Sequence, residues 1–175
     1  MKPQKFLVGI SSCLLGAAVR YDGKHKRDEA ISQFFSRYVE FVPICPEVGI
    51  GMSTPRPPIQ LVATHQGIRV RGVTDRHQDM TLALTHYAQQ QATLSSRLCG
   101  YIFKSRSPSC GLDDVPVFAE DGARLPGLLR GSYAHALLKL WPSLPVCDEN
   151  RLQTALGRKQ FLSEMTAYDH QRYQD

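Results

Sequence analysis

The chain has 175 residues, of which 42% are hydrophobic and 21% are charged, enough to build the core of one compact domain. No apolar run approaches the ~20 residues of a transmembrane helix, and the first residues resemble no signal peptide. The net charge of +5 comes without a long basic run, which makes nucleic acid the less favoured partner. We therefore expect a cytoplasmic protein with no membrane association, formed by a single α/β domain over residues 1–175.

The N-terminal part of the chain predicts two strands with a helix between them. The apolar run at 6–10 is typical of a strand buried on both faces. Residues 29–38 carry apolar side chains near helical spacing, and Asp28 is placed to cap that helix. Residues 39–44 predict the second strand. The segment 45–58 holds many prolines and glycines, so we expect a stiff loop outside regular structure.

The middle of the chain predicts a hairpin, a long helix and a third strand. Runs at 59–62 and 68–73 flank a short turn and indicate a hairpin or a pair of edge segments. A helix is expected from 75 to 98, and Gly100 lies where a helix-ending glycine is common. Residues 101–103 then predict another buried strand.

The C-terminal part completes an alternating pattern. Residues 115–125 predict a small hairpin, and 131–141 predict a helix that Pro142 ends. A fourth strand is expected at 144–147, followed by a terminal helix at 150–173 packed on the sheet. Strands that alternate with helices predict a Rossmann-like α/β fold, with a mostly parallel sheet and helices on both faces.

Three of the five cysteines lie in loops that follow predicted strands: Cys13, Cys45 and Cys110. Loops at the carboxyl ends of parallel strands meet at one edge of the sheet, so these thiols can converge on one ligand. Cys99 precedes its strand, and we expect it to be a core residue. Cys147 ends a predicted strand, and topology alone allows it as a fourth ligand. We expect no disulfides in a reducing cytosol.

The spacing of the cysteines bears on the kind of centre they could form. Structural zinc favours closely spaced pairs such as Cys-x-x-Cys, and the sequence has none. Three thiolates from distant loops suit an iron–sulfur cluster in a prebuilt fold, with one iron left open as a Lewis acid. A catalytic zinc, or a cysteine nucleophile activated by His25 or an arginine, would use the same kind of residues.

The three cysteine loops together resemble the TudS-type thiouracil desulfidases, over roughly residues 5–152. The matching motifs are SSCLLG at 11–16, VRYDG at 19–23, CPEVG at 45–49, PRPPI at 55–59 and KSRSPSCG at 104–111. The resemblance implies a Rossmann-like fold with an oxygen-sensitive [4Fe-4S] cluster held by three cysteines. It also implies a non-redox reaction of thiouracil with water that gives uracil and hydrogen sulfide, with the substrate sulfur bound to the open iron. The implied partner is a thiolated pyrimidine or nucleoside.

The resemblance also assigns residues. It implies that the metal ligands are Cys13, Cys45 and Cys110, that Ser11 and Ser12 donate to the cluster, and that Glu47, Ser109 and Asp22 are catalytic candidates for proton transfer and substrate contact. These residue types suit those roles, because a carboxylate can activate water and a hydroxyl can donate to a developing anion. The family pattern has an acidic residue where Cys147 stands, which argues against Cys147 as a ligand.

Plainer interpretations stand beside these assignments. Glu47 and Asp22 could only shape turns, and Arg56 could keep its charge in water. At the level of function, the alternative is a non-catalytic iron–sulfur or zinc protein, such as a sensor or a structural protein. In that case Cys147 could close the coordination of the metal, whereas an enzyme needs an open position and a pocket beside it.

Overall fold

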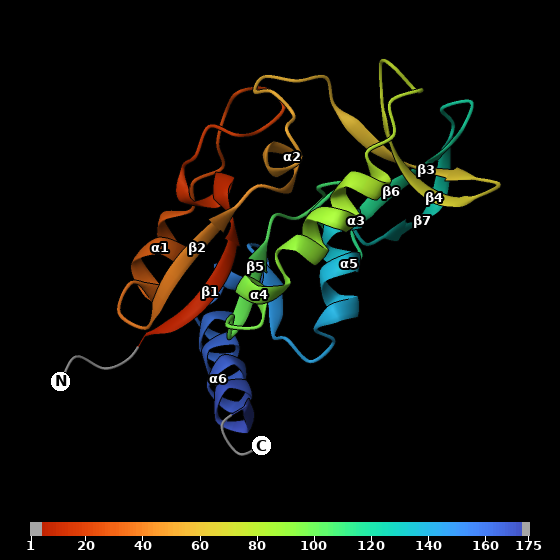
Figure 1. Cartoon of the computed structure of the whole chain (residues 1–175). Coiled ribbons are helices and arrows are strands. Elements are labelled where there is room, and N and C mark those ends of the chain that lie inside the picture. The colour runs from red at the N-terminus through yellow and green to blue at the C-terminus, as the bar shows by residue number, and fades with distance from the viewer. Residues whose placement is uncertain (1–4, 173–175) are drawn as a thin grey trace.

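The structure is a computed structural model that describes residues 5–172. Its strands and helices form two sheets with helices packed around them (Figure 1). In chain order the elements are β1 (Phe6–Ser11), α1 (Glu29–Phe35), β2 (Val39–Ile44), α2 (Pro46–Gly49), β3 (Ile59–Thr64), β4 (Gly67–Gly72), α3 (Thr81–Gln90), α4 (Ala92–Ser95), β5 (Gly100–Phe103), β6 (Val115–Ala119), β7 (Arg124–Leu129), α5 (Ser132–Leu140), β8 (Val146–Asp148) and α6 (Ala155–Arg172), with short 3-10 turns η1 (Ser12–Leu15) and η2 (Arg151–Gln153).

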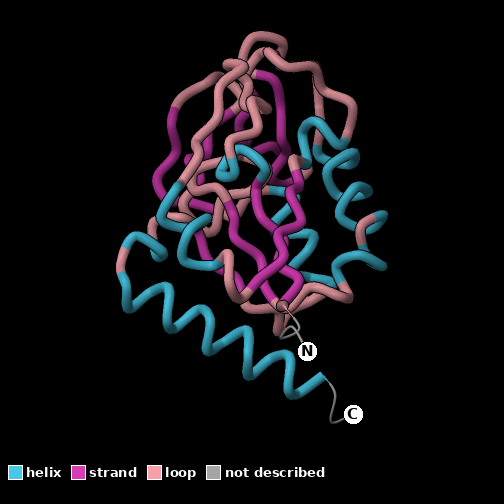
Figure 2. Tube along the Cα trace, turned by 90° about the vertical axis from the view of Figure 1, so that its left-hand side faces the viewer, coloured by secondary structure: helices cyan, strands magenta, loops and turns pink. Residues whose placement is uncertain are grey.

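The first sheet is entirely parallel, in the order β2-β1-β5-β8. Val8 and Ile10 of β1 are fully buried against α1 and α6 on one face, while α3 and α5 pack on the other face. Figure 2 shows the long C-terminal helix α6 lying outside the strands. The prediction of an α/β fold with a parallel sheet and helices on both faces is confirmed. Within residues 5–172, every helix is too short or too polar to cross a bilayer.

The second sheet joins two hairpins. The β3–β4 and β6–β7 pairs are antiparallel, and β3 also pairs with β6 in parallel, which gives the order β4-β3-β6-β7. Leu61 and Val70 of this sheet pack against Leu84 of α3. The sequence predicted the β6–β7 hairpin and allowed the β3–β4 hairpin as one of two alternatives, but it contained no sign of the β3–β6 pairing that unites them.

Three expectations about the helices need correction. The segment 45–58 is not wholly irregular, because Pro46 begins the one-turn helix α2, at a position where a missing N–H costs nothing. The helix expected at 75–98 begins only at Thr81, whose hydroxyl instead accepts a hydrogen bond from Val70 N at 2.8 Å. A polar side chain that hydrogen-bonds to a neighbouring strand competes with the hydrogen bonds that would extend the helix toward its N-terminus. The helix then breaks at Gln91 before α4.

Gly100 does not end a helix but opens strand β5. Packing requires a glycine at position 100, because a Cβ there would lie 2.8 Å from Met165 Sδ and 3.0 Å from Phe161 Cζ of α6. The close approach of α6 to the sheet, a tertiary contact, therefore explains this glycine. By contrast, Asp28 caps α1 as expected, since its carboxylate accepts a hydrogen bond from Ile31 N at 3.0 Å.

Candidate functional site

The three loop cysteines line one cavity of about 510 Å³ at the carboxyl ends of the parallel strands. Cys13 lies in η1 directly after β1, Cys45 lies between β2 and α2, and Cys110 lies in the loop after β5. Figure 1 places α2 and the loop after β1 at the same end of the sheet. Ser11, Ser12, Glu47 and Ser109 line the same cavity. The topology thus brings together residues that lie almost a hundred positions apart in the chain.

Burial holds the three thiols in their protonated form. It raises the pKa of Cys13 to about 11, although the ammonium of Lys104 opposes that rise. Burial also raises the pKa of Cys45, and it raises that of Cys110 most, against a lowering hydrogen bond from Ser11. A metal that binds here must displace these protons, because the thiolate is the ligand.

The cysteines are spread around the cavity wall. Within residues 5–172, no three His, Cys, Asp or Glu side chains converge tightly enough to hold a single metal ion. In an iron–sulfur cluster each cysteine binds a different iron, so the ligands surround a larger object. An all-sulfur donor set also favours iron–sulfur clusters over hard cations, which prefer oxygen ligands.

Glu47 is held from two sides beside the cysteines. Arg56 Nε and Nη2 each lie 2.7 Å from Glu47 Oε2, and Ser109 Oγ donates to Oε1 at 2.7 Å. Arg56 also donates to Ser53 O at 3.2 Å and to Thr54 Oγ1 at 3.3 Å. The Arg56 side chain is only 4% exposed, so it does not keep its charge in water as the plainer interpretation proposed. Its place between prolines in a matched motif was the signal for this role.

A second buried network was missed by the sequence reasoning. Glu149, after β8, accepts hydrogen bonds from Lys104 Nζ, from Ser105 N at 2.8 Å and from Ser105 Oγ at 2.6 Å. Burial alone would raise the pKa of Glu149, but the hydrogen bonds from Lys104 and Ser105 bring it below its usual value. Lys104 N also donates to Ser11 Oγ at 2.9 Å. Lys104 and Ser105 belong to the same motif as Cys110, which was the available signal.

Two of the polar residues singled out in the first loop stay outside the cavity wall. Asp22 is in the exposed turn at the cavity mouth, where it accepts hydrogen bonds from Lys24 N at 3.1 Å and from Arg20 Nε at 3.4 Å. His25 is exposed, and its Nδ1 accepts from Arg27 N at 3.2 Å. Asp22 is therefore linked to the cavity wall through Arg20, which does line it.

The remaining two cysteines lie away from this cavity. Cys99 is buried near the end of α6, where its Sγ lies 3.2 Å from Asp169 Oδ1. Cys147 is 3% exposed and packs in the core that contains Val8 and Ile10. Both are free thiols, as are the three in the cavity wall.

A family model described as 2-thiouracil desulfurase matches residues 8–149. The chain belongs to the 2-thiouracil desulfurase family. The matched range contains every residue that lines the cavity and leaves out α6. The resemblance seen in the sequence motifs is thereby confirmed.

Two known proteins are similar to this chain over most of its length. The uncharacterized protein YbbK of Bacillus subtilis (strain 168) is 29% identical over 156 residues, which cover 86% of this chain and 100% of the relative. A solved structure of the [4Fe-4S]-dependent thiouracil desulfidase TudS is 27% identical and superposes with a TM-score of 0.62. That match covers 90% of this chain and 99% of TudS.

Proposed function

We propose that this protein desulfurates a thiolated pyrimidine, so that thiouracil and water give uracil and hydrogen sulfide without net redox change. The observation that carries the proposal is that three cysteines and the Glu47–Ser109 pair line one cavity. Membership of the 2-thiouracil desulfurase family and the likeness to the [4Fe-4S]-dependent TudS support it.

The proposed cofactor is a [4Fe-4S] cluster with Cys13, Cys45 and Cys110 as ligands. When bound, it would supply an open iron that takes the substrate sulfur and polarises the thiocarbonyl carbon. Ser11 and Ser12 are assigned as hydrogen-bond donors to the sulfur atoms, because both hydroxyls line the cavity beside the thiols. The ammonium of Lys104 favours the thiolate form of Cys13, so it also favours ligation.

Glu47 is assigned as the proton acceptor for the attacking water. Arg56 occupies Oε2, which leaves Oε1 as the oxygen that can face the reacting atoms, with Ser109 bonded to it. Water adds its oxygen to the carbon that carries sulfur, the carbon–sulfur bond breaks, and both water protons end on the sulfide. The first of them passes through Glu47. Once protonated, Glu47 can donate to Ser109 Oγ, which frees the Ser109 hydroxyl to donate to the charge that develops on the pyrimidine.

Asp22 remains the third catalytic candidate, in a supporting role. Its contacts to Arg20 and Lys24 fix the turn at the cavity mouth, so its effect on substrate would pass through Arg20. The alternative function, a non-catalytic iron–sulfur or zinc sensor or structural protein, is less well supported. A closed metal centre needs a further ligand, and Cys147 packs in the hydrophobic core instead of the cavity wall.

Anaerobic reconstitution with iron and sulfide, followed by a sulfide-release assay on 2-thiouracil and 4-thiouracil, tests the proposal. We expect about four irons per chain and the release of sulfide and uracil in equal amounts. A fully reconstituted protein that releases no sulfide from either compound would refute the enzyme assignment and favour the sensor. Omission of iron is the matched control, and it should abolish the release.

A further inference from the structure

Tyr21 is the one aromatic side chain among the described residues that line the cavity. The apolar side chains around it are aliphatic: Val19, Ile44, Pro46 and Pro108. Tyr21 is 46% exposed, so its ring is not buried in the core and remains accessible to a ligand. An aromatic ring at the wall of a binding cavity offers a flat face to a ligand and keeps its hydroxyl in water.

The position of Tyr21 is tied to the reacting groups. Its carbonyl accepts a hydrogen bond from Arg56 N at 2.9 Å, and Arg56 is the residue whose side chain holds Glu47. The turn is closed by Gly23 N, which donates to Arg20 O at 2.9 Å. The Arg20 guanidinium lies 5.6 Å from the Tyr21 ring centroid, within the range of a cation–π contact. The ring is therefore presented by a braced turn.

The chemistry of a pyrimidine matches this arrangement. Its edge carries carbonyl, thiocarbonyl and N–H groups, for which Glu47 and Ser109 are suitable partners. Its two faces are apolar π surfaces, and stacking on an aromatic side chain is a common way for proteins to bind a base. Within the described cavity wall, the Tyr21 ring is the surface suited to stacking.

We propose that Tyr21 stacks on the pyrimidine ring and selects aromatic thiopyrimidines over other thiocarbonyl compounds. This inference rests on the proposed function, because it assigns a substrate-recognition role within the same cavity. It makes Tyr21 a specificity-determining residue, distinct from Glu47 and Ser109, which contact the reacting atoms.

The test compares the binding of uracil and 5,6-dihydrouracil to the reconstituted protein by titration calorimetry. The two ligands carry the same carbonyl and N–H groups, but dihydrouracil is saturated at two carbons and has no aromatic face. We expect Tyr21→Ala to raise the Kd of uracil by about tenfold or more, the scale of lost base stacking, and to change that of dihydrouracil by less than about twofold. Tyr21→Phe, which keeps the ring, should stay within about threefold of wild type for both ligands.

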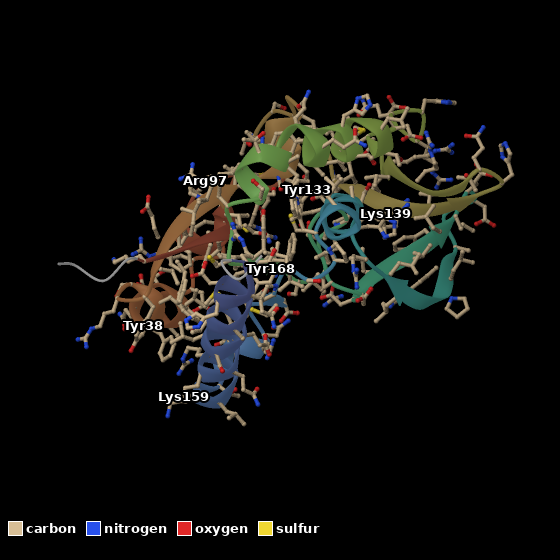
Figure 3. All side chains as sticks on the ribbon, turned by 60° about the horizontal axis from the view of Figure 1, so that its bottom comes forward. Tyr38, Arg97, Tyr133, Lys139, Lys159 and Tyr168 are labelled. Atoms are coloured by element: carbon tan, nitrogen blue, oxygen red, sulfur yellow. The ribbon has the colours of Figure 1, made fainter. Side chains whose placement is uncertain are left out.

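The chain offers a matched control in Tyr38, which is 44% exposed and also packs near an aromatic ring, at 5.9 Å from that of Phe34. Tyr38 lies just before β2, whereas Cys45 follows that strand at its other end, and Figure 3 shows Tyr38 beside α1. Tyr38→Ala should leave the binding of both ligands unchanged. Iron content and thermal stability are measured for each variant, so that loss of the cluster or of folding is recognised.

The outcomes separate the recognition role from the proposed function. If Tyr21→Ala binds uracil as wild type does, or weakens both ligands by the same factor, the stacking role is wrong. Suppose that the wild-type protein releases no sulfide but prefers uracil over dihydrouracil, and that Tyr21→Ala loses this preference. In that case the stacking role stands and the proposed reaction is refuted. A wild-type protein that binds neither ligand refutes the stacking role, and the proposed reaction is then judged by sulfide release alone.

Discussion

Replacement of Glu47 by Gln removes the proposed proton acceptor and leaves a side chain of the same size. The amide N–H₂ of Gln cannot accept from Arg56, so we expect the amide carbonyl to turn toward Arg56 and the N–H₂ to face Ser109. Ser109 can adapt, because its Oγ lies 3.1 Å from Ser107 Oγ and can donate there. The network therefore survives the substitution but loses its carboxylate.

The cost follows from the bonds that lose their charge. Glu47 accepts one hydrogen bond of 2.7 Å from Arg56 Nε and one of 2.7 Å from Ser109 Oγ, and a hydrogen bond to a charged group is worth roughly 1 kcal/mol more than a neutral one. We expect the free energy of unfolding to fall by about 2 kcal/mol, and the Tm to fall by about 4–8 °C in a chain of this size. Turnover should fall by about a hundredfold or more, the scale for losing a general acid or base.

Iron content, sulfide release and urea unfolding are measured on the same anaerobic preparation of Glu47→Gln. The control is Glu164→Gln, which removes an exposed carboxylate bonded to Arg151 at 2.5 and 3.0 Å in the part of the chain outside the family match. The control should keep both iron and turnover. If Glu47→Gln releases sulfide at the native rate with a full cluster, Glu47 only shapes its loop, and proton transfer must be reassigned to Ser109 or Asp22.

Three further changes probe the ligands and their support. Cys45→Ser should abolish both iron binding and activity, because an alcohol is a poor iron ligand at neutral pH. The control Cys99→Ser should keep its iron. Iron retained in Cys45→Ser would contradict the ligand assignment. Hydrogen bonds overcome burial and lower the pKa of Glu149 below its usual 4.5, so its stabilisation is present above that pH and lost as the pH falls through the lower folded value. Glu149→Gln should flatten this acid limb in urea unfolding, and an unchanged limb argues against the network. Gly49→Ala places a methyl group within the ring of Tyr87, so it should lower the free energy of unfolding by about 1–3 kcal/mol. It should also reduce iron uptake, because α2 must shift. Full iron uptake would mean that the site tolerates this shift of α2.

The parts of the fold that were predicted correctly depend on local sequence signals. The two central strands of the parallel sheet, β1 and β5, appear as short apolar runs because both of their faces are buried. The prediction for Gly100 was wrong. A glycine near the end of a helix is a local signal, whereas this glycine is required by the tertiary contact with α6. The second sheet was not foreseen because its central pair, β3 and β6, joins segments separated by two strands, β4 and β5, and two helices, α3 and α4.

The candidate site divides in the same way. The cavity-lining positions of Cys13 and Cys45 could be predicted from their place directly after strands. The burial of Arg56 could not, because it depends on Glu47, which in turn meets Ser109 from 62 residues away in the chain. Sequence thus indicates which residues reach a common edge, but the pairing of charges at that edge depends on side-chain packing across several loops.

The parallel sheet has one consequence for how this protein would age in air. A metal that supplies the free energy of folding leaves an unfolded chain when it is lost. Here the ends of separate strands bring Cys13, Cys45 and Cys110 to one cavity, and the core beside it is built from apolar side chains such as Val8 and Ile10. If oxygen destroyed the cluster, the fold would remain and the three thiols would stay in place. The inactivation would then be reversible by reconstitution with iron and sulfide.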